Sequence, residues 1–158
     1  MSLLRVGLAA ALGSAFVLVT PAAPPAATTE QVVSDPNTGL AISGIDPVAY
    51  FTDRRPLAGL PKHEVRYVGT IWRFRNAGNQ AAFVAHPEVY MPRYGGYDPI
   101  AIGRGLALAG NPLLWTIAGQ HLYLFFNDEA RARFIADPNE AVLLADEKWP
   151  SVASTLVP

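Results

Sequence analysis

Hydrophobic and polar residues alternate along two pairs of segments, and this alternation predicts two β-hairpins. The first pair is 65–68 and 71–74, joined by a turn at Gly69-Thr70. Within 71–74, tryptophan and phenylalanine alternate with arginine, which is the period of a half-buried strand. The second pair is 115–117 and 121–125, joined by a turn at 118–120.

Each predicted hairpin is followed by a residue that favours the start of a helix. Asn76 and Asn127 are expected to cap one helix each, and Asp137 is expected to cap another helix that runs towards Trp149. The apolar segment 100–108 is either a short buried helix or an irregular strand. This order predicts an α+β fold, a small single domain of antiparallel β-hairpins packed with short helices. The two halves share an order of elements, without a convincing repeat in sequence.

The first residues have the pattern of a secretory signal. Arg5 precedes an uninterrupted apolar and small-residue run over 6–19, and the small-residue segment 20–27 follows. The run is shorter than the roughly 20 residues that span a bilayer. We expect residues 1–27 to be a signal peptide or, if uncleaved, an N-terminal anchor. The protein is then periplasmic or secreted, with a membrane association only through an uncleaved segment.

The rest of the chain divides into three parts by composition. Residues 28–43 are rich in small and polar residues without a hydrophobic period, so they are expected to form a flexible leader. The domain is expected over 44–150. Residues 151–158 then form a C-terminal tail.

Composition excludes several classes of function. The 12 basic and 13 acidic residues are interspersed, so the chain lacks the clustered basic face of a nucleic-acid-binding protein. It contains no cysteine, which excludes thiolate metal sites, thiol redox chemistry and a cysteine nucleophile. No serine lies in a G-x-S-x-G motif, and no phosphate-binding loop is present. These absences favour a non-enzymatic protein, and the sequence requires no cofactor.

Two short segments carry a family resemblance. Gly44–Phe51 reads G-I-D-P-V-A-Y-F, and Tyr94–Asp98 reads Y-G-G-Y-D. Both resemble signature segments of the secreted bacterial YHS-domain proteins, and the resemblance extends from Gly44 to Pro150. Further matches in the same order are Tyr67, Gly69, Trp72, Phe74, Phe83, Pro87, Tyr90 and Trp149-Pro150. The resemblance implies a compact exported domain with relatives among metal-associated proteins, whose cysteines carry the metal. Asp98 stands where a cysteine is common in the family.

These segments supply the candidate ligand-binding residues, which are Asp46, Tyr50, Tyr94, Gly95, Gly96, Tyr97 and Asp98. In one interpretation, Asp98 and the tyrosine hydroxyls line a small pocket for a ligand or a hard cation. In the other, the tyrosines are core residues and Asp98 caps a helix that begins at Pro99. His63, His86 and His121 do not have the spacing of a shared metal site. The identity of any metal therefore stays open.

Two functions remain as hypotheses. The first is a non-enzymatic accessory protein that handles a small ligand or a metal, with a small molecule or a membrane or periplasmic protein as its partner. The second is a structural or protein-interaction module without a ligand site. An exposed apolar surface around 106–114 would favour the second hypothesis.

Overall fold

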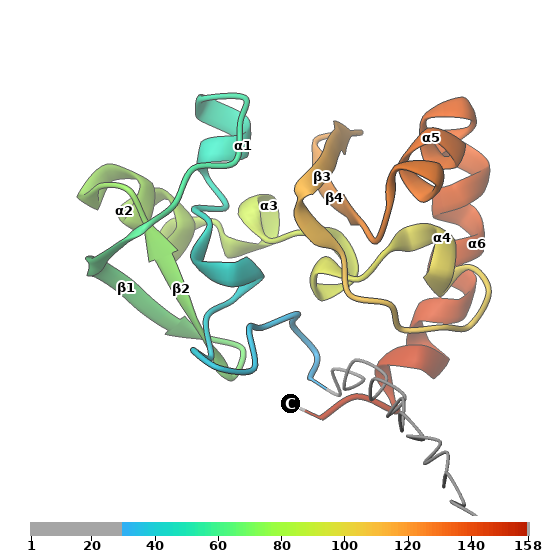
Figure 1. Ribbon diagram of the computed structural model, residues 1–158, viewed down its shortest axis with the longest axis horizontal. Helices are drawn as coiled ribbons and strands as arrows, with labels where there is room; N and C mark the ends of the chain where they lie inside the picture. The colour runs from blue at the N-terminus through green and yellow to red at the C-terminus, as the bar shows by residue number, and fades with distance from the viewer. Residues whose placement is uncertain (1–29, 158) are drawn as a thin grey trace, which may run out of the picture.

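The computed structural model describes residues 30–157, which fold into two antiparallel hairpins and several short helices (Figure 1). Strand β1 pairs with β2 and β3 pairs with β4, in two separate sheets. The α+β prediction is therefore confirmed. The elements in chain order are η1 (Ile42–Gly44), α1 (Ala49–Thr52), β1 (Leu60–Tyr67), β2 (Thr70–Phe74), α2 (Ala77–Ala85), α3 (Pro87–Tyr90), η2 (Arg93–Gly96), α4 (Pro99–Ile102), β3 (Asn111–Ala118), β4 (His121–Phe125), α5 (Asp128–Ala136) and α6 (Pro138–Ala153).

Both hairpins turn through two residues with positive φ. These are Val68 and Gly69 in the first hairpin, and Gly119 and Gln120 in the second. Two consecutive positive φ values match the right-handed twist of the flanking strands, which is why such tight loops suit hairpins. The first turn thus lies one residue earlier than predicted. Both first strands also begin earlier than predicted, and each has a register shift near its start.

The two halves are built as structural repeats. In residues 42–90, a 3-10 turn leads into an Asp-Pro pair, a short helix, a hairpin, an asparagine-capped helix and a helix that begins with proline. Residues 94–141 contain the same units in the same order. We call these segments the first repeat and the second repeat. The shared order of elements therefore reflects a real repeat, which the sequence reading did not recognise.

Each repeat contains an equivalent backbone hydrogen bond that joins its beginning to the segment before its hairpin. Gly59 N–H donates to Gly44 O, and Gly110 N–H donates to Gly96 O, both at 2.9 Å. At both Gly59 and Gly110, a Cβ atom would approach the backbone of the second hairpin strand to less than 3.0 Å. Glycine is thus required at the same place in each repeat because the two chain segments touch there. The residues identical at equivalent positions include Gly44 and Gly96, Asp46 and Asp98, Pro47 and Pro99, Gly59 and Gly110, Phe74 and Phe125, Asn76 and Asn127, Phe83 and Phe134, and Pro87 and Pro138.

Strand β4 of the second repeat faces the first repeat and contributes to two cores. Leu122 and Leu124 pack with Trp72 and Phe83 in the core of the first repeat. The alternate residues of β4, including Phe125, pack in the core of the second repeat. This follows from the period of a strand, in which successive side chains point to opposite faces. Figure 1 shows the β3–β4 hairpin between the first-repeat elements and helices α4–α6.

The two terminal expectations need correction. The leader predicted over 28–43 is wrong for its described part, because Val32, Leu40 and Ile42 are buried in the core. The tail predicted over 151–158 is also wrong for its described part, because α6 continues to Ala153 and Leu156 is buried. Long-range packing that has no local signature orders both segments. The signal predicted over 1–27 lies outside the described residues.

Candidate functional site

The two aspartates of the predicted site are buried structural acceptors. Asp98 is 1% exposed. Its Oδ1 accepts from the N–H groups of Ile100 and Ala101, at 2.8 and 3.4 Å, and its Oδ2 accepts from Phe126 N–H at 2.9 Å. The predicted helix cap at Asp98 is therefore confirmed. The carboxylate also joins this cap to the end of β4.

Asp46 has the equivalent position and the equivalent bonds in the first repeat. It is fully buried, and its Oδ1 accepts from Val48 N–H at 2.8 Å. Its Oδ2 accepts from Arg75 N–H at 2.8 Å and from the Asn79 amide at 2.7 Å. Both aspartates therefore fasten the start of a repeat to the end of its hairpin. Buried charge is tolerated here because backbone donors surround it.

Tyr50 packs inside the first repeat and contacts the second. Its hydroxyl donates to Pro112 O at 2.8 Å, and its ring meets Trp115 edge-on at 5.2 Å. Burial raises the pKa of the Tyr50 hydroxyl above its ordinary value. The side chain therefore stays neutral and joins α1 to the beginning of β3.

Gly95, Gly96 and Tyr97 hold the N-terminal segment. Gly95 has a φ of 62°, and a Cβ atom there would lie 1.9 Å from Gln31 O. Gly95 O accepts from Val33 N–H at 2.8 Å, and the Tyr97 hydroxyl donates to Glu30 O. Gly96 has a φ of 91°, which suits glycine. These three residues therefore build the fold by binding the segment that was expected to be flexible.

Tyr94 belongs to a polar and aromatic cluster on the side facing α6. Its hydroxyl donates to Asp146 Oδ1 at 2.8 Å, and Arg93 Nη2 donates to the same oxygen at 2.8 Å. The Tyr94 ring meets Trp149 at 5.5 Å. Burial raises the pKa of Tyr94, and burial together with Arg93 lowers the pKa of His121. Arg93 and Tyr94 both bond to Asp146, so the cluster attaches α6 to the segment around Tyr94.

The predicted site residues thus divide between the two repeats. Asp46 and Tyr50 lie in the first repeat, whereas Tyr94, Tyr97 and Asp98 lie in the second. Tyr94 and Tyr97 share a contact with Trp149. Across residues 30–157, no group of three or more acidic or histidine side chains is placed to hold a metal ion.

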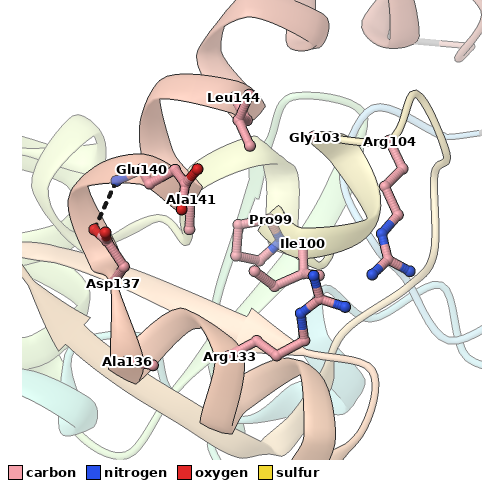
Figure 2. A pocket seen from close by; sticks show the side chains of 10 residues that line it. All are labelled: Pro99, Ile100, Gly103, Arg104, Arg133, Ala136, Asp137, Glu140, Ala141 and Leu144. Atoms are coloured by element: carbon pink, nitrogen blue, oxygen red, sulfur yellow. Dashed lines mark hydrogen bonds between the residues drawn. The ribbon is translucent and has the colours of Figure 1, made fainter.

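A pocket that the sequence reading missed lies between α4, α5 and α6 (Figure 2). Its volume is about 320 Å³. Its walls combine an apolar surface with two arginines and two acids. The lining residues are Pro99, Ile100, Gly103, Arg104, Arg133, Ala136, Asp137, Glu140, Ala141 and Leu144.

The first repeat fills the place that corresponds to this pocket. Counted from the shared Asp-Pro pair, Phe51 is equivalent to Gly103, and counted from the helix-starting proline, Tyr90 is equivalent to Ala141. The Phe51 and Tyr90 rings meet edge-on at 5.4 Å. The second repeat has neither ring, and Gly103 and Ala141, at the equivalent positions, line the pocket. Recognising the repeat would have allowed this difference to be found in the sequence.

Comparison of the chain with models of protein families, with curated proteins and with solved structures found no match. Among the described residues, no helix is both long and apolar enough to cross a membrane.

Proposed function

We propose that this protein is an exported, non-enzymatic domain of the YHS type that binds a small ligand in the pocket between α4, α5 and α6. The observation that carries the proposal is the difference between the repeats at this place, with an aromatic pair in one and an open pocket in the other. Export is supported by the signal-like pattern of residues 1–27. The family is supported by the two signature segments.

Binding is favoured over catalysis by the chemistry of the pocket. Its lining contains no serine, threonine, histidine, lysine or tyrosine that could act as a nucleophile or a proton carrier. Asp137 is engaged as the cap of α6, where its Oδ1 accepts from Glu140 N–H at 3.0 Å. Concave sites with apolar walls and a few charged groups are typical of small-molecule binding.

The proposal is tested by titrating a library of small-molecule fragments into the protein and following the NMR chemical shifts of the backbone amides. We expect the perturbed amides to cluster on the pocket residues and to lose their response in Ala136→Trp, which fills the pocket. Ala132→Trp is the matched control, because Ala132 is exposed on the same helix but does not line the pocket. Asp98→Ala is expected to lower stability without moving the binding site. Fragments that bind elsewhere, or equally in Ala136→Trp, would contradict the proposal.

A protein-interaction module is the second candidate, and one observation favours it. Leu106, Leu108 and Leu113 are all at least 40% exposed, in the segment where an apolar surface was anticipated. Phe126 is 53% exposed and lines the same hollow as Leu106 and Leu108. Exposed apolar groups of this kind are typical of contact surfaces. Self-association measured by sedimentation velocity, abolished by Leu113→Ser and unaffected by Ala136→Trp, would favour this function over ligand binding.

A further inference from the structure

We infer that the ligand of the α4–α5–α6 pocket is an organic anion, a carboxylate or a phosphate monoester that carries a small apolar body. This inference rests on the proposed function and adds the chemical class of the ligand. It is carried by Arg104, in the turn after α4, and Arg133, in α5, which line the same pocket. Figure 2 shows both guanidinium groups on one side of the pocket, near Ile100.

Neither arginine has a partner among the described residues. The ion pairs of residues 30–157 involve other basic side chains, and neither guanidinium makes a side-chain hydrogen bond. The arginine–carboxylate pairs of this part of the chain are Arg73 with Glu64 and Arg93 with Asp146, at 2.7 and 2.8 Å. Two positive charges on one side of a pocket, neither of them in an ion pair within the described chain, favour an oxyanion, which guanidinium groups bind with paired N–H donors.

The arginines are specific to the repeat that has the pocket. Counted from the Asp-Pro pair, the residue equivalent to Arg104 is Thr52. Counted from the capping asparagine, the residue equivalent to Arg133 is Ala82. At these equivalent positions the second repeat therefore lacks two aromatic rings and carries two arginines that the first repeat does not have. A packing role alone accounts for neither arginine.

The charges of Asp137 and Glu140 have a separate explanation. Both lie at the start of α6, where acids are favoured by the helix dipole, and Asp137 caps that helix. Figure 2 shows them on the side of the pocket opposite the guanidinium groups. Arg133 lies in the last turn of α5, where a cation is favoured, but its guanidinium caps no carbonyl. Within residues 30–157 Glu140 also makes no ion pair, but it lies with Asp137 on the wall away from the guanidinium groups, so the arginine side of the pocket carries positive charge.

The apolar part of the ligand is indicated by the wall beside the arginines. Ile100, Ala136, Ala141 and Leu144 line the pocket together with the arginines. A bare inorganic anion would leave this wall in contact with water. A carboxylate or phosphate with a short hydrocarbon chain would cover it while its oxygens meet the guanidinium groups.

The probes are hexanoate and hexyl phosphate, with hexanamide as the neutral analogue and acetate as the anion without a chain. Dissociation constants for each probe come from amide NMR titrations of the full chain. We expect hexanoate or hexyl phosphate to bind at the pocket about tenfold more tightly than hexanamide or acetate. Arg104→Gln and Arg133→Gln should each weaken the binding of the two anions by about tenfold. Arg55→Gln, an exposed arginine away from the pocket, should change nothing.

The outcomes separate the two proposals. If hexanamide binds at the pocket as tightly as the anions, the ligand class is wrong while the ligand site stands. If anions bind equally well to the wild type and to both arginine variants, the assignment to this arginine pair is overturned. If no probe and no fragment perturbs the pocket, both the anion class and the proposed function fail. Unfolding curves of each variant show that a lost response does not come from a lost fold.

Discussion

At the scale of single residues, the signature segments act through the backbone. Asp46 and Asp98 accept three hydrogen bonds each and are almost inaccessible to solvent. A buried carboxylate that already accepts three hydrogen bonds has little capacity left for a ligand. Gly95 also has a structural role, because it contacts the N-terminal segment too closely to admit a side chain.

Gly95 and Gly105 form a matched pair for testing this role. Both have positive φ, at 62° and 78°, but an added Cβ meets Gln31 O at position 95 and meets nothing within 4 Å at position 105. We expect Gly105→Ala to lower the free energy of unfolding by about 1 kcal/mol through backbone strain alone. Gly95→Ala should lower it by roughly 3 kcal/mol, because the clash adds to the strain. Urea unfolding of both variants measures the difference, and equal losses would contradict the close approach.

Tyr50 provides a prediction of pH dependence. Burial raises its pKa above the ordinary 10.0, so the unfolded chain ionises first as the pH rises. The contribution of Tyr50 to stability is therefore unchanged below about pH 10 and falls above it, because the Tyr50 hydroxyl then holds its proton in the folded state and loses it in the unfolded state. We expect Tyr50→Phe to reduce this fall by up to about 1.4 kcal/mol per pH unit. Tyr67→Phe is the control, since Tyr67 is 40% exposed. Equal alkaline slopes in wild type and Tyr50→Phe would count against a buried, hydrogen-bonded hydroxyl.

At the scale of elements, the sequence predicted the helix caps and hairpins, which depend on residues close together in the chain. Asn76, Asn127 and Asp137 cap their helices through side-chain bonds to backbone N–H groups three residues ahead. The hairpins were predictable because the alternation and the glycines lie within a few residues. The buried segments at both ends were not predictable in this way, because their partners lie far along the chain.

Leu156 tests the packing of the C-terminal segment. It is 8% exposed and belongs to the core of the second repeat, whereas Leu143 on α6 is 69% exposed. We expect Leu156→Ala to cost about 2–3 kcal/mol in the free energy of unfolding. Leu143→Ala should cost less than about 0.5 kcal/mol. Chemical denaturation gives both values, and a negligible loss in Leu156→Ala would restore the view of a free tail.

The candidate site was missed for the same reason as the buried ends. Arg104 and Arg133 are separated in sequence by a whole hairpin, and neither belongs to a motif. Their convergence depends on how α4 and α5 pack, which no periodicity encodes. The segment Tyr94–Asp98 drew attention instead because it resembles a family signature, although its contacts are structural.

At the scale of the whole molecule, the two repeats share strand β4. Its residues Leu122 and Leu124 complete the core of the first repeat, while Tyr123 and Phe125 complete the core of the second. Tyr50 adds a hydrogen bond from the first repeat to Pro112 in the second. The core of the first repeat therefore depends on a strand of the second, and the second repeat alone would expose Leu122 and Leu124.

We expect the domain to unfold in one cooperative transition. Urea curves followed by far-ultraviolet circular dichroism should coincide with curves followed by the fluorescence of Trp72 in a variant in which the other tryptophans are replaced by phenylalanine. A fragment of residues 91–158 should not fold alone, because Leu122 and Leu124 would be exposed. Two separated transitions, or a folded fragment, would show that the repeats are independent units.

The two ends of the described chain meet, since Gln31 N–H donates to Val157 O at 2.8 Å. A domain whose entry and exit points coincide can be placed within a surface loop of another protein without forcing that loop apart. The same proximity lets a short linker join the ends while a new opening is cut at an exposed turn such as Gly119-Gln120. Because its two ends are adjacent, we expect this domain to tolerate both insertion into another protein and circular permutation.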